Sequence, residues 1–400
     1  MEGVRGFSAL LVFFVHFYAQ FGTRAQGTFA YDVTSFMGTL GHCGVDVFFA
    51  LSGFIIYGLL LKKPAGYLDF VRRRIVRLYP AFTAVFALYV LLSLALPSYS
   101  KLPKSPFPAL EYLAANFLML PGFFPIVPMI TVAWSLSYEL CFYLALPILM
   151  WGLRFYAWAQ PLRIVWWVAI CGVCLKLTTA GLFPHGRMIM FGCGILLRET
   201  IAWRIAWTRF GQWFALAAFL ATLALAGHIG VPIFTHVILL PGDILAPLFV
   251  STYALGYFAL SGEGWLSKGL SWDWLRWVGN MSYSYYLIHG LVLHFLGKTV
   301  ELLRVPAHLS PVAFSGLWLA SIASTLVGGS ILFLAIEKPF LLRASRQGRK
   351  IAAPAGVSSL AQSPVAESLV AESPVMQSLL KTQANRHAEP PSAGTPGMFY

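Results

Sequence analysis

The chain contains few charged residues for its length. Of its 400 residues, 11% are charged and 58% are hydrophobic, whereas about 25% of the residues in a soluble domain are charged. This scarcity of charge excludes an ordinary soluble globule and predicts a polytopic membrane protein. A small-residue cleavage site is also lacking after the first apolar run, so we expect this run to be retained as a helix rather than removed as a signal peptide.

Cysteine is scarce as well. An odd number of cysteines within apolar segments argues against disulfides, because cysteine there usually behaves as a small hydrophobic residue. Cys171 and Cys174 form a C-x-x-C spacing, but no second pair and no following histidine completes a zinc or haem site. We therefore expect no metal site among the five cysteines, which are Cys43, Cys141, Cys171, Cys174 and Cys193.

Long apolar runs, in contrast, are abundant. A helix needs about twenty residues to cross roughly 30 Å of hydrocarbon, and the chain contains about ten candidate runs, at residues 6–22, 42–61, 79–97, 132–153, 163–181, 186–198, 211–228, 235–259, 277–297 and 312–336. Residues 107–128 are apolar but contain four prolines, which favours an external loop near the membrane interface over a spanning helix. The sequence thus predicts the all-α class, as a polytopic integral membrane helical bundle.

Lysine and arginine are distributed unevenly between the connecting segments. If the amino terminus is cytoplasmic, most of them fall on the cytoplasmic side, and the few left outside are Arg24, Lys101, Lys104, Arg187, Lys298 and Arg304. Because loops rich in these residues stay cytoplasmic, we expect both termini in the cytoplasm. The net charge of +13 is then explained by membrane topology and anionic lipid, and no nucleic-acid partner is expected.

The composition changes after Arg349 to alanine, serine, proline and glutamate, with a degenerate repeat between residues 363–369 and 373–379. Such a segment buries too little apolar surface to offset the entropy lost on ordering. We expect a transmembrane domain over residues 1–341 and a disordered, low-complexity cytoplasmic tail over residues 342–400.

The first apolar run contains two ionisable residues, Arg5 and His16, eleven positions apart. Hydrocarbon offers no water to an ionisable side chain, so a histidine there needs a partner or a function. A histidine hydrogen-bonded to a neighbouring helix is the alternative. The spacing alone leaves both interpretations open.

The second run opens with Asp46 and continues to Ser52 and Gly53. An acid in this position must face protein or water, where it either orients a partner or braces the end of the helix. For Ser52 and Gly53, close packing of small residues against another helix is favoured over a catalytic role.

An arginine cluster precedes the third run. On a helix, Arg77 shares a face with Arg73 and with Arg74. Arginine's planar donors suit phosphate, so the cluster is a candidate dock for a nucleotide. The alternative is an anchor on anionic lipid, with about 1 kcal/mol from each side chain.

Two further ionisable residues, Glu139 and His289, lie inside apolar runs. A rise of 1.5 Å per residue places His16 about 16 Å beyond Arg5, and His289 about 18 Å beyond residue 277. Glu139 would lie roughly 20 Å from the inner face. The three side chains are therefore expected at one level, as a buried reaction centre; pairing of Glu139 with a neighbouring helix is the alternative.

The motifs occur in the order found in the membrane-bound acyltransferase family 3, whose members O-acylate bacterial cell-surface sugars and some secondary metabolites. The chain resembles this family over about residues 2–341. The start, residues 1–5, is shorter than the usual leader, and the soluble esterase-like domain of many relatives is not seen. The matching elements are Arg5 with His16, residues 44–54, Arg74 with Arg77, residues 134–139, residues 282–289 and residues 337–339.

The resemblance implies a bacterial inner-membrane enzyme that uses an acyl-coenzyme A donor, expected to be acetyl-coenzyme A, bound from the cytoplasm. It implies that His16 is the essential histidine. The acceptor would be a hydroxyl of a surface saccharide or lipid-linked saccharide, such as exopolysaccharide or lipopolysaccharide, or alternatively of a small glycoside or macrolide.

We assign roles to the candidate residues on this basis. His16 would be general base or transient acyl carrier, Glu139 or Asp46 would fix its tautomer, and His289 would complete the catalytic set. The donor phosphates would be held by arginines, namely Arg74 and Arg77 with Arg73 and Arg5. A transporter or flippase, in which the same buried groups form a substrate path, is the alternative function; the absence of an internal helix repeat argues against it.

Overall fold

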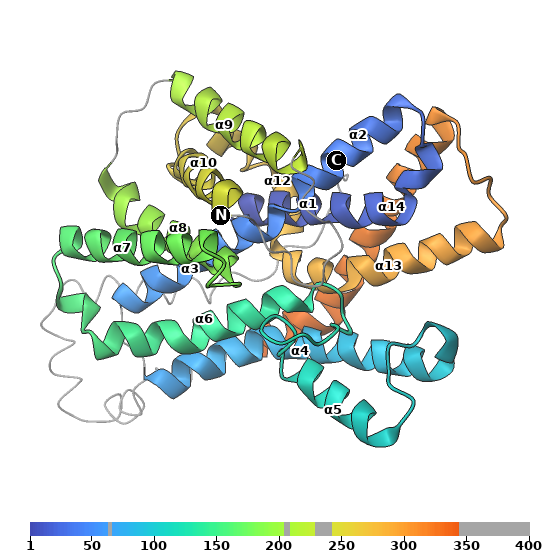
Figure 1. Ribbon diagram of the computed structural model, residues 1–400, viewed down its shortest axis with the longest axis horizontal. Coiled ribbons are helices and arrows are strands. Elements are labelled where there is room, and N and C mark those ends of the chain that lie inside the picture. Colours follow the sequence, from blue (N-terminus) through green and yellow to red (C-terminus); the bar gives the residue numbers. More distant parts are fainter. Residues whose placement is uncertain (63–65, 204–208, 229–241, 344–400) are drawn as a thin grey trace, which may run out of the picture. The chain divides into compact units, whose positions relative to one another are not determined.

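The computed structural model describes residues 1–62, 66–203, 209–228 and 242–343. All regular elements within these residues are helical, which confirms the expected all-α class. Figure 1 follows the helices along the chain. They are α1 (Glu2–Phe21), α2 (Phe29–Gly41), α3 (Gly44–Lys62), α4 (Tyr67–Ala95), α5 (Pro106–Phe117), α6 (Ala133–Gly152), α7 (Gln160–Thr179), α8 (Ile189–Thr200), α9 (Arg209–His228), α10 (Gly242–Leu260), α11 (Gly264–Gly269), α12 (Asp273–Asn280), α13 (Ser282–Leu302) and α14 (Pro311–Leu332).

The described helices belong to one compact unit, Met1–Leu342; the expected transmembrane domain over residues 1–341 stays a prediction. The expected disordered tail over residues 342–400 falls outside the described residues from residue 344 onward. Its disorder therefore stays a prediction.

Among the described residues, seven helical segments are long and apolar enough to cross a membrane, which supports a multi-pass membrane protein. By length and composition these are Glu2–Ala25, Phe29–Lys62, Tyr67–Ala95, Ala133–Gly152, Gln160–Thr179, Asp243–Leu260 and Pro311–Arg343. The total of about ten spans and the cytoplasmic placement of both termini stay predictions.

Three of the expected runs do not appear among these seven segments. Helix α8 has 12 residues and rises only about 18 Å, and the apolar helix Phe210–Ala226 is also short. The run expected over residues 277–297 is divided, because α12 ends at Asn280 and α13 begins at Ser282. The first part of the run expected over residues 235–259 lies outside the described residues.

Helices α2, α5 and the short α11 occupy segments where the sequence predicts none. Helix α2 begins after Thr28, whose side-chain oxygen accepts a hydrogen bond from the N–H of Tyr31 at 3.4 Å. Helix α5 lies at the start of the loop expected over residues 107–128, and Pro106 occupies its first turn. Proline is tolerated at that position, because the first N–H groups of a helix have no partner within the helix.

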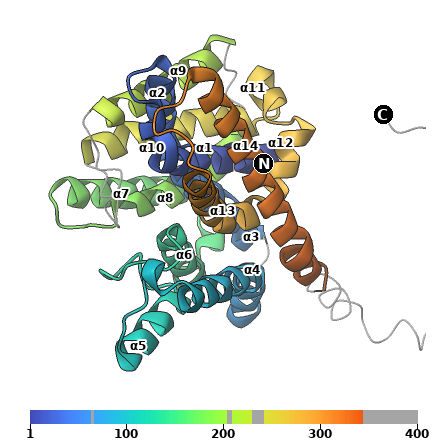
Figure 2. The same ribbon diagram turned by 90° about the vertical axis from the view of Figure 1, so that its right-hand side faces the viewer.

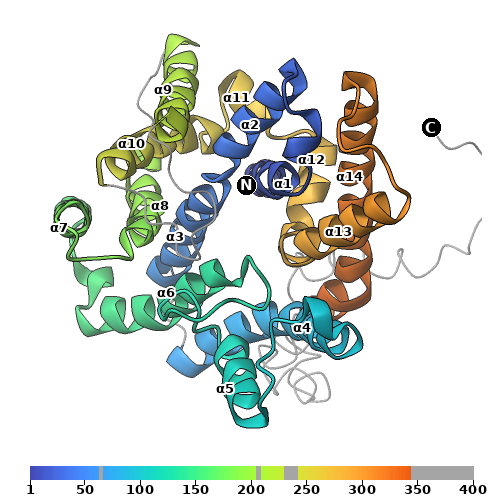
Figure 3. The same ribbon diagram turned by 45° about the vertical axis from the view of Figure 1, so that its right-hand side comes forward.

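Helix α1 is surrounded by other helices. Figure 3 looks nearly along its axis and shows α2, α3, α12 and α13 around it, and each of the four packs against it. Helices α4 and α6 lie side by side below this group in Figure 2. Residues far apart in the sequence thus meet along α1.

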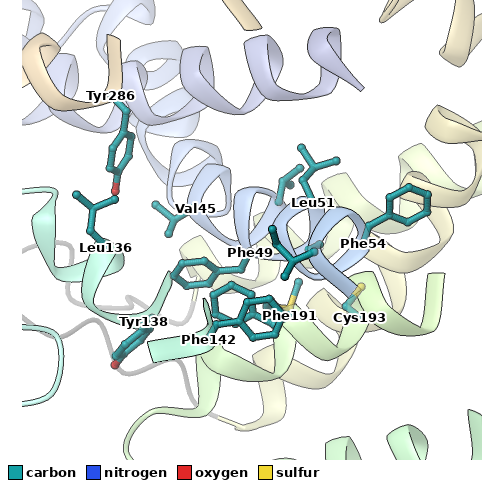
Figure 4. Packing of buried hydrophobic residues seen from close by; sticks show 14 of the residues in the cluster. Val45, Phe49, Leu51, Phe54, Leu136, Tyr138, Phe142, Phe191, Cys193 and Tyr286 are labelled. Carbon is teal, nitrogen blue, oxygen red and sulfur yellow. The ribbon is translucent and has the colours of Figure 1, made fainter. Parts of the chain in front are cut away.

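Helices α3 and α8 approach each other through glycines. A Cβ atom at Gly53 would overlap the carbonyl oxygen of Phe191, and one at Gly194 would overlap that of Ala50. The expected role of Gly53 in close helix packing is confirmed. Beside this contact the ring of Phe191 stacks on Phe49 of α3 and on Phe142 of α6, at centroid distances of 4.6 and 4.2 Å (Figure 4).

We expect Gly194→Ala to destabilise the protein by about 1–3 kcal/mol, because the added methyl group forces α3 and α8 apart. The measurement is the midpoint of thermal unfolding in detergent. Gly172→Ala on α7 is the control, since nothing lies within 4 Å of a Cβ there. Equal midpoints for the two variants would contradict the proposed contact.

Candidate active site

The rings of His16 and His289 meet between α1 and α13. Their centroids are 4.9 Å apart and the ring planes are inclined at 66°. His289 is fully buried and His16 is partly buried. The structure therefore brings together two of the ionisable residues that the sequence places at one depth.

Hydrogen bonds fix the tautomer of neutral His289. Its Nδ1 atom lies 3.1 and 2.9 Å from the carbonyl oxygens of Tyr285 and Tyr286. Because carbonyl oxygens only accept, Nδ1 must donate, and Nε2 of the neutral ring carries a lone pair. This Nε2 is buried and has no hydrogen-bond partner among the described residues. His289 can therefore accept a hydrogen bond or a proton within the site.

His16 lines a cavity of about 480 Å³, here called the histidine cavity, enclosed by α1, α4, α13 and residues 129–132. Its volume lies within the usual range for small-ligand sites, about 300–1,000 Å³. Next to apolar residues, its walls contain side chains able to hydrogen-bond a polar ligand, among them Gln20, Tyr89, Ser93 and Thr131.

A second cavity, of about 140 Å³, is called here the arginine cavity. Arg5, Arg74 and Arg77 line it together with Glu139. Within the described part of the chain, none of the three arginines forms an ion pair with a carboxylate. The Nε atom of Arg74 is buried and has no partner there. This cavity can therefore hold an anion such as a phosphate.

The arginine cavity does not include Arg73, which lies exposed on α4. The structure thus separates Arg73 from the other three arginines expected to hold the donor.

Glu139 lies in the arginine cavity and not beside His16. It accepts hydrogen bonds from the hydroxyl of Ser52, at 3.0 Å, and from the hydroxyl of Tyr143. Among the described residues no hydrogen bond joins Glu139 to His16. The depth estimate did not distinguish the two cavities, because it gives a level in the bundle and not the direction of a side chain.

Asp46 forms a buried ion pair. The Nε and Nη2 atoms of Arg187 lie 3.0 and 2.5 Å from its two carboxylate oxygens, and Nη2 also donates to the carbonyl oxygen of His42 at 2.9 Å. The ion pair joins the first turn of α3 to the segment before α8, which corresponds to the bracing role considered from the sequence. The sequence did not identify Arg187 as the partner of Asp46. The available signal was that Arg187 is one of the few basic residues placed on the outer side.

Tyr286 separates the two cavities. Its hydroxyl lies 2.7 Å from Oγ of Ser135 and donates to the carbonyl oxygen of Val132 at 3.2 Å. Tyr286 and Ser135 line the arginine cavity, whereas Val132 and Leu287 line the histidine cavity. The sequence marks residues 134–139 and 282–289 as motifs but does not assign this contact to Tyr286 or Ser135.

The described helices thus form a bundle in which His16, in ring contact with His289, lines one of two cavities and arginines line the other. The acyltransferase family 3 profile, described as an acyltransferase domain, matches residues 1–334. The chain belongs to this family of transferases, as the resemblance indicated.

Two curated relatives cover most of the chain. The chain is 27% identical to "Acyltransferase MdmB" of Streptomyces mycarofaciens over 395 residues, 88% of this chain and 94% of the relative. It is also 27% identical to "Exopolysaccharide production protein ExoZ" of Rhizobium meliloti over 338 residues, 80% of this chain and 95% of the relative. No solved structure shows significant similarity to the chain.

Removal of the carboxylate at Asp46 should destabilise the protein strongly. In Asp46→Asn a buried arginine loses its counter-charge, at a cost of about 3–5 kcal/mol. The measurement is the unfolding midpoint in detergent. Asp32→Asn, at an exposed position on α2, is the control and should change the midpoint little.

The double variant Asp46→Leu/Arg187→Met tests the reason for this loss, because it removes both charges. It should recover a large part of the stability. A double variant less stable than Asp46→Asn would show that the destabilisation has another cause.

Proposed function

We propose that the protein is an integral-membrane O-acyltransferase that transfers an acyl group, expected to be acetyl, from acyl-coenzyme A to a saccharide hydroxyl. The observation that carries this proposal is that His16 lines a ligand-sized cavity and is in ring contact with buried His289, next to a cavity lined by arginines. Family membership supplies the reaction class, and the two cavities supply separate places for an anionic donor and a hydroxyl acceptor.

The donor would bind at the arginine cavity from the cytoplasmic side of a bacterial inner membrane. The uneven distribution of basic residues supports this orientation. The side chains of Arg5, Arg74 and Arg77 fit the negative charge of the donor phosphates. A cavity of about 140 Å³ holds only part of such a molecule, so the rest would lie outside it, where exposed Arg73 is available.

The acceptor would occupy the histidine cavity with its hydroxyl at His16. His16 takes the hydroxyl proton as the oxygen attacks the thioester carbonyl. The ester C–O bond forms, the C–S bond breaks, and the proton passes from His16 to the leaving thiolate. Such positioned proton transfer contributes about 10²–10⁴-fold to a rate.

His289 would assist in this step. Because its Nδ1–H is held by backbone carbonyls, its Nε2 lone pair can stabilise the proton gained by His16. The tautomer of His16 would then depend on His289 rather than on Glu139 or Asp46, neither of which is hydrogen-bonded to it among the described residues.

The proposed acceptor class is a cell-surface saccharide. The name of one relative, an exopolysaccharide production protein, supports this class. The hydroxyl, amide and aromatic side chains in the walls of the histidine cavity are also compatible with a sugar.

His16→Ala should lower acyl transfer by about 10²–10⁴-fold, since it removes the proposed base. The measurement is transfer from radiolabelled acetyl-coenzyme A in proteoliposomes supplied with a saccharide extract. His308→Ala, at an exposed position before α14, should retain the wild-type rate. Transport of an unmodified saccharide without acyl incorporation would favour a transporter and contradict the proposal.

Arg74→Gln/Arg77→Gln should weaken acetyl-coenzyme A binding about tenfold or more, because hydrogen bonds to charged groups are lost. Equilibrium dialysis measures the affinity. Lysine at the two positions should restore it only in part, since an ammonium lacks the planar pair of donors. Arg154→Gln, at an exposed arginine outside the cavity, is the control; an unchanged affinity in the double variant would exclude these arginines from the donor site.

A further inference from the structure

Basic side chains gather at one end of the histidine cavity, around Tyr99. The Nζ atom of Lys298 lies 4.8 Å from the centroid of the Tyr99 ring, and the ring of His294 lies 6.3 Å from it. Lys101 follows two residues after Tyr99 and lines the same cavity. We call Tyr99, Lys101, His294 and Lys298 the basic end of the cavity.

The basic end lies at a distance from the histidine pair. Leu287, Leu291, His294 and Lys298 line the cavity from one face of α13, as their spacing on a helix requires. His289 and Lys298 are nine positions apart on this helix, which is a rise of about 13 Å. A ligand that reaches both ends is therefore extended.

The basic side chains that line this cavity have no acidic side chains beside them in its described lining. They are two lysines and two histidines. Lys298 has a counter-charge outside the lining, because its Nζ lies 2.8 Å from a carboxylate oxygen of Glu301.

Lys101 lacks such a counter-charge among the described residues. Its Nζ donates to the carbonyl oxygens of Pro128 and Met129, at 2.9 and 3.4 Å. An ammonium has three donors, so one remains for a ligand. Lys101 as a whole is exposed to solvent, and the partial desolvation of its ammonium lowers its pKa, a shift that a bound anion would oppose.

The position of Lys101 is also unusual for the expected topology. It is one of the few basic residues placed outside by the charge distribution, where lysine and arginine are depleted. Two others have acidic partners: Arg187 pairs with Asp46, and Lys298 pairs with Glu301. The other three, Arg24, Lys104 and Arg304, do not line the histidine cavity, so Lys101 is distinguished by facing a ligand-sized cavity without an acidic partner among the described residues.

We propose that the basic end binds an anionic group, a carboxylate or phosphate, that the acceptor carries at a distance from the hydroxyl to be acylated. Lys101 is the principal cation and Lys298 the second, while the acceptor hydroxyl lies at His16. This inference rests on the proposed function, because it assigns the histidine cavity to the acceptor. It restricts the acceptor class to acidic saccharides or saccharide phosphates.

Binding of a matched pair of sugars tests the inference. Maltose and maltose 1-phosphate differ only in the anion, and their affinities are measured by equilibrium dialysis with purified protein in phosphatidylcholine nanodiscs. Wild-type protein should bind maltose 1-phosphate about tenfold more tightly. Lys101→Gln should remove most of this preference with little effect on maltose, because it removes one charged contact.

Two variants control for folding and for general charge. Lys101→Arg keeps the charge and the contacts to the carbonyl oxygens, so it should keep the preference. Lys104→Gln removes a lysine from the same segment that does not line the cavity, and it should behave as wild type. Equal affinity of wild-type protein for the two sugars, no measurable binding of maltose 1-phosphate, or an unchanged preference in Lys101→Gln would each overturn the inference.

Two further binding measurements distinguish an anion on the acceptor from free phosphate and from a lipid headgroup. Inorganic phosphate should compete only weakly, and nanodiscs containing phosphatidylglycerol should leave the preference unchanged. Complete displacement by either one would show a site for free phosphate or a lipid headgroup and would overturn the assignment to the acceptor.

The acyl-transfer assay separates this inference from the proposed function. A Lys101-dependent preference without acyl transfer to any saccharide would refute the transferase function and leave an anionic-saccharide site. Transfer that depends on His16, without any preference for the phosphorylated sugar, would refute only the inference.

Discussion

The contact between the rings of His16 and His289 is the interaction on which the rest of the site depends. Among the described residues, no carboxylate forms a hydrogen bond with either ring. The environment of each imidazole is therefore set by the other ring and by backbone groups. The pair exists because α1 packs against α13, and α1 is itself enclosed by α2, α3 and α12 (Figure 3). Packing of helices thus determines chemistry here, since hydrocarbon cannot solvate an isolated ionisable side chain.

Much of the fold could be predicted because the hydrophobic runs are long. The all-α class, the multi-pass character and the positions of most helices follow from them. Helix α2 could not be predicted this way, since its start depends on the cap at Thr28. The division between α12 and α13 at Met281 was also missed, because the apolar run was read as one helix although α12 is much less apolar than α13.

The candidate site could be predicted only in part. The rise per residue correctly suggested that His16 and His289 meet, but a level in the bundle does not specify a direction, and Glu139 faces the other cavity. The Asp46–Arg187 pair joins residues 141 positions apart, so no local pattern contains it. Buried polar groups must find partners, but the sequence does not state which partner is nearest in space.

The position of the Tyr286 hydroxyl bears on how the membrane stays closed to ions. On the proposed orientation, the arginine cavity would open toward the cytoplasm and the histidine cavity toward the outside. Tyr286 would then belong to the barrier that keeps ions and protons from passing between them. The hydroxyl donates to the carbonyl oxygen of Val132 and lies 2.7 Å from the hydroxyl oxygen of Ser135. If the proposed acyl transfer takes place between the two cavities, the protein would have to admit the thioester there without letting ions through, which would link its catalysis to the electrochemical gradient of the cell.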